Sequence, residues 1–173
     1  QTVTNGATVI FTVQATGTPP LRYQWRLNGR NLIGATNAIL VLPKVQLINA
    51  GEYSVRLLNA TGAATSAVAN LTVRTPPTIA KQPQGQVVSP GASVTFSVTA
   101  TGFEPLLFQW RFNGKDLPGA TNATLVLSNV QAGAAGDYSV RVGNVVGSMV
   151  SASARLQVNV PPVILRHPQA QTV

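Results

Sequence analysis

Cysteine is absent from the chain of 173 residues, and acidic residues and histidine are scarce. Without cysteine the chain has neither a disulfide bond nor a thiolate metal site. Four acidic residues and one histidine give little material for a catalytic acid–base pair or a calcium site, because both need several such groups in one place. The apolar runs are also shorter than the roughly 18 residues of a membrane-spanning helix. We therefore expect no enzyme, no cofactor, no metal site and no direct insertion into a membrane.

The few acidic and histidine residues are also far apart in the sequence. The acids are Glu52, Glu104, Asp116 and Asp137. None of them forms a close pair with another, and general acid–base catalysis needs two matched groups at one site. His167 lies near the end of the chain with no second group beside it, so we interpret it as an exposed linker residue. This spacing predicts no catalytic residues.

Basic residues outnumber acidic ones by twelve to four, which gives a net charge of +8. An excess of this sign suggests an acidic partner such as an anionic polysaccharide, nucleic acid or a membrane surface. The basic residues are spread along the chain without a run, so a chain kept in solution by its net charge is the simpler alternative. Aromatic residues make up only 6% and most of them fit a core, which argues against stacking on bases. We expect no specific nucleic-acid partner.

The sequence repeats itself without a gap at an offset of 85 residues. Trp25 falls on Trp110 and Tyr53 on Tyr138, and more than half of all paired positions are identical. Such self-similarity marks an array of equivalent units. Residues 171–173 also repeat residues 1–3 after two periods. We therefore expect the parent protein to be a longer array.

Within each repeat, apolar and polar residues alternate along short stretches bounded by Gly, Pro and Asn. In residues 94–100, valine, phenylalanine and alanine alternate with threonine and serine, a pattern typical of strands with one buried face. Asn28-Gly29 and Asn113-Gly114 predict tight turns, because these residues tolerate positive φ. Several short strands joined by such turns predict an all-β fold built from β-sandwiches.

Four motifs in each repeat carry a resemblance to a known family. In the second repeat they are VTFSVTATG from Val94, FQWRFNG from Phe108, ATLVLSNV from Ala123 and GDYSVRVGNVVG from Gly136. Each repeat resembles an intermediate-set immunoglobulin domain, of the kind found in tandem in large exported bacterial surface proteins. The resemblance covers nearly the whole chain. It implies two immunoglobulin-like β-sandwiches arranged end to end.

The resemblance assigns a core signature to both repeats. It consists of a core tryptophan, a corner tyrosine two residues before the second cysteine position, and valines in place of both cysteines. The residues are Trp25, Tyr53, Val13 and Val55 in the first repeat, and Trp110, Tyr138, Val98 and Val140 in the second. A disulfide closing this loop would contribute roughly 4 kcal/mol, and each buried valine recovers about 1.5–2 kcal/mol. Such a domain folds without an oxidant.

The proline-rich junctions predict how the repeats connect. Pro76-Pro77 and Pro161-Pro162 favour stiff linkers with restricted hinging, and Pro83 allows strand A to kink from one sheet to the other. We expect a first domain over residues 1–75 that lacks its own strand A, and a second over 76–160. Residues 161–173 are expected to form the linker and strand A of a third repeat. We also hypothesise head-to-tail continuity, in which this terminal segment of one copy precedes Gln1 of the next, as a donated strand or in a covalent array.

An arginine pair on one sheet face is the candidate ligand site of each domain. The strands that carry them are neighbours in the fold that the resemblance implies, so we expect Arg26 and Arg56 in the first domain, and Arg111 and Arg141 in the second, to point outward side by side. Arginine forks suit sulfate, carboxylate or phosphate groups, although charged residues on a strand face can also simply discourage edge pairing. We therefore expect a non-catalytic structural module of an extracellular or cell-surface stalk or filament. The alternative is an adhesion module that binds an acidic glycan or protein.

Overall fold

The computed structural model describes residues 1–167, and its regular secondary structure consists of β-strands and two short 3₁₀ turns. The chain divides into two units, Gln1–Thr75 and Pro76–Val173, hereafter unit 1 and unit 2. Each unit has its own hydrophobic core. Within residues 1–167 no helix is long and apolar enough to cross a membrane.

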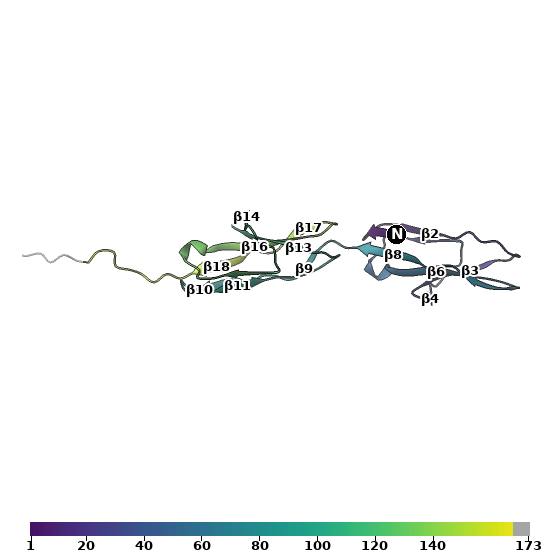
Figure 1. The fold of residues 1–173 in the computed structure, drawn as a ribbon, viewed down its shortest axis with the longest axis horizontal. Helices are drawn as coiled ribbons and strands as arrows, with labels where there is room; N and C mark the ends of the chain where they lie inside the picture. Colours follow the sequence, from purple (N-terminus) through teal and green to yellow (C-terminus); the bar gives the residue numbers. More distant parts are fainter. Residues whose placement is uncertain (168–173) are drawn as a thin grey trace, which may run out of the picture. The chain divides into compact units, whose positions relative to one another are not determined.

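Each unit contains short strands and one turn of 3₁₀ helix. Unit 1 contains β1 (Thr2–Thr4), β2 (Val9–Thr12), β3 (Arg22–Leu27), β4 (Arg30–Asn31), β5 (Ile39–Leu42), η1 (Leu47–Asn49), β6 (Gly51–Asn59), β7 (Gly62–Thr65) and β8 (Ala69–Arg74). Unit 2 contains β9 (Thr78–Lys81), β10 (Gln86–Val88), β11 (Val94–Ser97), β12 (Thr99–Thr101), β13 (Leu107–Phe112), β14 (Lys115–Asp116), β15 (Thr124–Leu127), η2 (Ala132–Ala134), β16 (Gly136–Gly143), β17 (Ser148–Val150) and β18 (Ala154–Val158) (Figure 1).

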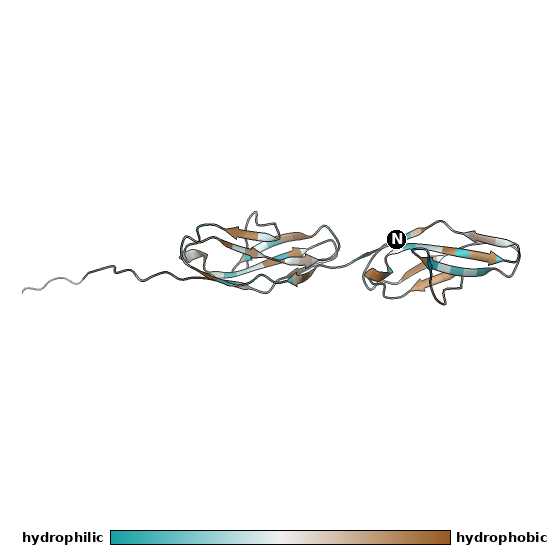
Figure 2. Cartoon of the chain, turned by 90° about the horizontal axis from the view of Figure 1, so that it is seen from below, coloured by the Kyte–Doolittle hydropathy of each residue, from teal (hydrophilic) through white to brown (hydrophobic). Residues whose placement is uncertain are grey.

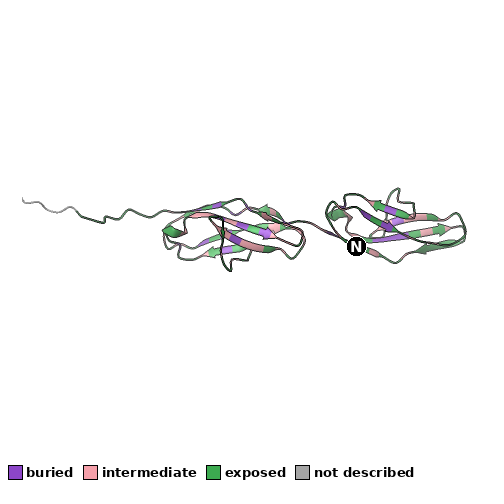
Figure 3. Ribbon diagram, turned by 90° about the horizontal axis from the view of Figure 1, so that it is seen from above, coloured by how far each residue is buried: buried purple, intermediate pink, exposed green. Residues whose placement is uncertain are grey.

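A larger sheet packs against one smaller sheet in unit 1 and against two smaller sheets in unit 2. In unit 1 the larger sheet has the order β1-β8-β6-β3-β4, with β7 paired to β6, and the smaller sheet pairs β2 with β5. In unit 2 the larger sheet has the order β10-β18-β16-β13-β14, with β17 paired to β16, and β11 and β12 pair with β15 and β9. Buried and exposed residues alternate along the strands (Figure 3). The predicted all-β fold of two tandem sandwiches is therefore confirmed.

Buried hydrophobic residues form the core of each unit, and hydrophobic residues occur along the strands of both units (Figure 2). Trp25, with 4% of its surface exposed, and Trp110, with none, are buried with their neighbouring aromatic rings. The sequence pattern missed Val45 and Val130, which are fully or almost fully buried outside any strand. Their backbone amides donate hydrogen bonds to the carbonyls of Ala7 and Ala92, next to the pairing of β2 with β5 and of β11 with β15, which holds each loop over the core.

The predicted Asn-Gly turns have the expected backbone. Asn28 and Gly29 have φ values of 48° and 77°, and Asn113 and Gly114 have 47° and 80°. These values suit the turn that matches the right-handed twist of a hairpin. Each turn connects the end of a long strand to a two-residue strand, β3 to β4 and β13 to β14.

Strand A of unit 2 is divided between the two sheets. Its first half, β9, pairs antiparallel with β12, and its second half, β10, pairs parallel with β18. The buried Pro83 lies between the halves, where the sequence predicted the change of sheet. Proline suits such a break because it cannot donate to a ladder.

Unit 1 retains only part of this strand. Its β1 pairs parallel with β8, as β10 does with β18, so the second half of strand A is present. The expectation that the first domain lacks its own strand A is therefore wrong for the second half of that strand. Residues 14–16, which correspond to β12, form no strand, because β12 depends on pairing with the first half of strand A.

The terminal segment forms no strand where the structure describes it. Residues 161–167 are exposed and without strand pairing, and His167 is among them. Residues 168–173 of the predicted third strand A lie outside the described residues. Pro161 and Pro162 are exposed, whereas Pro77 is buried in unit 2.

Candidate functional site

The four candidate arginines lie on the central strands of the two larger sheets. In unit 1, β3 carries Arg26 and β6 carries Arg56. Arg56 lies directly opposite Gln24 and Arg26 directly opposite Ser54, which makes the two arginines diagonal neighbours. Diagonal neighbours on one face lie about 7–8 Å apart, within reach of long side chains. The register of β13 and β16 gives Arg111 and Arg141 the same relationship in unit 2.

The arginines of unit 2 share one carboxylate that sequence reasoning treated as isolated. Arg111 Nε lies 3.0 Å from Asp116 Oδ1, and Arg141 Nη2 lies 3.9 Å from Asp116 Oδ2. Arg111 also donates to the carbonyl of Gly114. The Asn-Gly turn brings Asp116 opposite Arg111, so the hairpin spacing held the signal for this pair. The face of unit 2 therefore carries its own counter-charge.

Unit 1 has a different set of residues at the same positions. Asn31 replaces Asp116 opposite Arg26, and Arg22 replaces Leu107 opposite Leu58. A cavity of about 320 Å³ lies here, lined by Arg22, Tyr23, Gln24, Arg26, Asn31, Arg56 and Leu58. Sequence reasoning missed Arg22 and the exchange of aspartate for asparagine. A comparison of the repeats position by position would have shown both.

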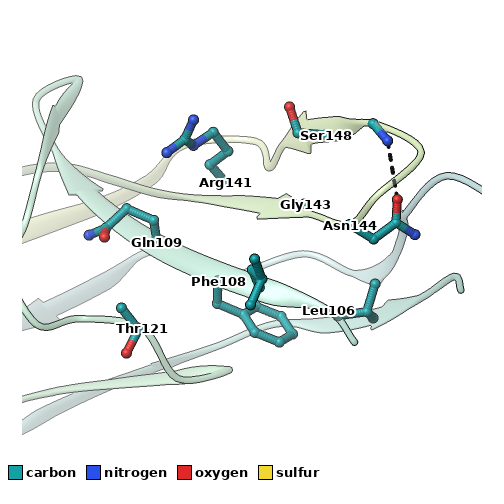
Figure 4. A pocket seen from close by; sticks show the side chains of 10 residues that line it. Leu106, Phe108, Gln109, Thr121, Arg141, Gly143, Asn144 and Ser148 are labelled. Carbon is teal, nitrogen blue, oxygen red and sulfur yellow. Dashed lines mark hydrogen bonds between the residues drawn. The ribbon is translucent and has the colours of Figure 1, made fainter. Parts of the chain in front are cut away.

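Unit 2 has a more apolar hollow beside Arg141, with a volume of about 660 Å³ (Figure 4). Leu106, Leu107 and Phe108 line it together with Gln109 from β13. The Asn144 side chain at its rim accepts a hydrogen bond from the Gly147 amide at 3.1 Å, which holds the loop before β17. The hollow therefore offers one arginine against an apolar wall.

A second cavity of unit 1, of about 460 Å³, lies where strand A is incomplete. Its lining residues are Ala15, Thr16, Gly17, Thr18, Leu21, Leu57, Leu58, Asn59, Thr61, Gly62, Ala63 and Ala64. In unit 2 the corresponding Gly102 lies against the linker, so that a Cβ there would stand 2.9 Å from Pro77 Cα and 3.0 Å from the Pro76 carbonyl oxygen. Gly17 has only the side chains of Leu21 and Asn59 near it. We call this cavity the strand-A seat.

The core signature residues serve the fold. The indole nitrogens of Trp25 and Trp110 donate to the backbone oxygens of Asn37 and Asn122, both at 2.9 Å. Val55, Val98 and Val140 are buried at the positions where the family carries cysteines, whereas Val13 is half-buried. These residues have no polar group free for a ligand.

Residues 1–167 contain no group of three or more His, Cys, Asp or Glu side chains that could hold a metal ion. Both aspartates form ion pairs within unit 2. Asp116 contacts Arg111 and Arg141, and Asp137 Oδ1 lies 3.5 Å from Arg155 Nη1. Burial raises the pKa of the Tyr53 and Tyr138 hydroxyls above 10.0, because the charged phenolate is disfavoured away from water. Both hydroxyls are engaged by backbone carbonyls.

Residues 1–73 match the family described as Immunoglobulin I-set domain, and residues 76–144 match the family described as Immunoglobulin domain. Roundabout homolog 3 of Homo sapiens is 30% identical over 100% of this chain, which spans 14% of that protein. A titin I-band fragment, I67-I69, has a TM-score of 0.67 at 24% identity, covering 97% of this chain and 65% of the fragment. Extracellular domains 3–5 of Drosophila OTK give 0.56 at 24% identity, covering 92% and 59%. The chain belongs to the immunoglobulin family, as two cysteine-free immunoglobulin domains in tandem.

Proposed function

We propose that this tandem is a non-catalytic structural module of an extracellular or cell-surface stalk or fibre, joined head to tail through strand A. The observation that carries this proposal is a cavity in unit 1 at the place that the linker and β9 occupy in unit 2. In unit 2 the first half of strand A pairs with β12 and covers Gly102. In unit 1 the corresponding place is the strand-A seat. An open sheet edge is a template for a strand from another chain.

The terminal segment of a second copy has the sequence to fill the seat. Pro161-Pro162 repeats Pro76-Pro77, and residues 163–166 repeat the positions of β9 with Val, Ile, Leu and Arg. Within the described residues this segment is exposed and unpaired. A contact between the end of one copy and the start of the next is heterologous, so it propagates as a fibre instead of closing into a dimer. In a covalent array, a segment preceding the repeat in the same chain would fill the seat.

Gly17→Ala tests strand donation directly. In unit 2 a methyl group on the corresponding Gly102 would clash with Pro77, so a methyl group on Gly17 should block the second proline of a donated linker. Without a donated strand, the methyl group on Gly17 would contact only side chains. We expect light scattering to show chains that lengthen with concentration, and we expect Gly17→Ala or deletion of residues 161–173 to leave monomers. Gly34→Ala is the control, since its Cβ would meet open space and its φ of +75° is also unfavourable for a side chain. A chain that stays monomeric at high concentration overturns donation and leaves the covalent array.

Adhesion through the arginine-bearing face is the second candidate function, with an acidic glycan or protein as partner. The observation that favours it is the diagonal placement of two arginines on the exposed face of each larger sheet. Repeated weak sites of this kind would sum to a strong interaction along an array. Binding of the 173-residue chain to an array of acidic and neutral glycans tests the adhesive function, and equal binding to both classes contradicts it.

The extracellular placement in both proposals is supported by similar structures such as the extracellular domains 3–5 of OTK.

A further inference from the structure

We infer that unit 1 alone carries an oxyanion site, made by Arg22, Arg26 and Arg56, for the sulfate or carboxylate groups of an acidic polysaccharide. This inference rests on the adhesive candidate function and narrows it from a face present in both units to one cavity. The three arginines line the same cavity of about 320 Å³. Arg56 on β6 is the diagonal neighbour of both Arg22 and Arg26 on β3, because it lies opposite Gln24, which stands between them.

The three guanidinium groups have no carboxylate of their own. Within residues 1–167, none of the three makes an ion pair, and the Arg26 Nε atom is buried without a hydrogen-bond partner. The nearest acid on the same strand, Glu52, lies four residues from Arg56, which is about 13 Å at 3.3 Å per residue. Like charges on neighbouring strands repel one another. A bound oxyanion would relieve this repulsion.

In unit 2 the corresponding arginines are paired with an aspartate of the same unit. Asp116 contacts both Arg111 and Arg141, and Leu107 stands in the place of Arg22. The charge of the set falls from +3 in unit 1 to +1 in unit 2. Two substitutions therefore separate a site with three free cations from a site whose cations are occupied. This difference between two otherwise similar domains is the observation that assigns the ligand to unit 1.

The surroundings of the cavity favour a ligand held only through its charged groups. The backbone around Arg56 is paired on both sides, with β3 and with β7, so a ligand there meets side chains and gains no main-chain bonds. Extended peptides commonly depend on such main-chain bonds for affinity. The Gln24 amide nitrogen already donates to the backbone oxygens of Trp25 and Leu32. Arginine forks, by contrast, match sulfate and carboxylate oxygens, which a polysaccharide carries at regular intervals.

Exchanging the two distinguishing residues between the units tests the inference in both directions. Calorimetric titration with a heparin-derived octasaccharide should show one site on the 173-residue chain. We expect Arg22→Leu with Asn31→Asp to weaken binding at least tenfold, since it gives unit 1 the charges of unit 2. Leu107→Arg with Asp116→Asn should raise the stoichiometry to two sites. Both exchanges use residues that the other unit already accommodates, so we expect both variants to fold.

The control and the ligand arms separate the remaining explanations. Lys44→Asn removes one positive charge at a position outside the cavity. The corresponding residue of unit 2 is Asn129, which has a similar positive φ, so this variant should leave binding unchanged.

Loss of binding on desulfation of the octasaccharide assigns the site to sulfate, and retained binding assigns it to carboxylate. If Arg22→Leu with Asn31→Asp binds like the parent chain, the site is not in unit 1. If polyglutamate binds as tightly as the octasaccharide, the ligand class is wrong. Absence of any polyanion binding overturns the adhesive candidate as well, whereas strand donation is read separately by light scattering.

Discussion

The Tyr138 hydroxyl donates a hydrogen bond to the backbone carbonyl of Ala134 at 2.9 Å. The corresponding bond in unit 1, from Tyr53 to Asn49, measures 2.7 Å. Each bond ties the end of a 3₁₀ turn to the strand that follows it, and each tyrosine stacks on a core phenylalanine, with ring centroids 4.9 Å and 4.8 Å apart. The acceptor in both units is a backbone carbonyl, so the bond does not depend on whether the acceptor residue is asparagine or alanine.

Tyr138→Phe should destabilise unit 2 by about 1–2 kcal/mol. The ring stays in the core, but the carbonyl of Ala134 loses its partner, and one such bond contributes roughly 0.5–1.5 kcal/mol while an unsatisfied buried group adds to the loss. Urea unfolding followed by tryptophan fluorescence measures the change, because Trp110 is the tryptophan of unit 2. Tyr23→Phe is the control, since its half-buried hydroxyl has no hydrogen bond to any of residues 1–167. An unchanged midpoint for Tyr138→Phe would contradict the corner's role.

The stability of both units should fall as the pH rises above about 10. Burial raises the pKa of Tyr53 and Tyr138 in the folded chain above 10.0, so the unfolded chain releases these protons first. The contribution of these tyrosines to the free energy of unfolding is therefore constant below their pKa in the unfolded chain. It is lost as the pH rises through their pKa in the folded chain. Free energies of unfolding measured between about pH 8 and pH 12 check this. The variant with Tyr53→Phe and Tyr138→Phe should lose less stability over this range, and an identical slope would show that other groups cause the loss.

Trp110→Ala should cost roughly 3–5 kcal/mol, as truncations of large aromatic side chains in cores do. The indole is fully buried, packs against Phe96 at a centroid distance of 6.1 Å and donates to Asn122. Circular dichroism in urea gives the loss without relying on the deleted fluorophore. Trp110→Phe keeps most of the volume and should lose less. A loss below about 1 kcal/mol for Trp110→Ala would mean that the tryptophan is not central to the core.

Gly102→Ala should destabilise the chain more than Gly17→Ala does, although the two glycines have nearly equal φ values of +153° and +156°. Both substitutions strain the backbone by about 1–3 kcal/mol. Only Gly102 also meets backbone atoms, at Pro76 and Pro77, whereas Gly17 meets a leucine side chain that can move. Urea midpoints of the two variants, each reported by the tryptophan of its own unit, give the comparison. Equal losses would show that the linker does not pack on Gly102.

Asp116→Asn should change the stability of unit 2 by less than about 1 kcal/mol. The side chains of Arg111 and Asp116 are 32% and 51% exposed, and exposed ion pairs contribute about 0–1 kcal/mol. Thermal or urea unfolding at low and moderate salt measures this. A larger loss would mean that Asp116 holds the hairpin between β13 and β14 together, in addition to neutralising the two arginines.

The fold class, the repeat and most of the core could be predicted from the amino-acid sequence. Alternation of apolar residues fixes which face of a strand is buried, and Asn-Gly fixes the hairpin turn through its tolerance of positive φ. Trp25, Trp110 and the corner tyrosines could be identified because their motifs are local and occur twice. Val45 and Val130 escaped this reasoning, because they lie outside strands and are buried by loops that only the folded sandwich brings over the core.

Which arginines have a carboxylate partner, and which strands lack a neighbour, depends on long-range contacts in the folded chain. Arg26 and Arg56, and Arg111 and Arg141, come from strands that are distant in sequence, and the register of the sheet makes them neighbours. The hairpin then supplies Asp116 to one pair and Asn31 to the other. Likewise, strand A could be located in the sequence, but its division between two sheets and the seat in unit 1 depend on long-range pairing. Alternation and turn signals act over a few residues, whereas ion pairs and strand edges depend on the packing of segments that the sequence keeps apart.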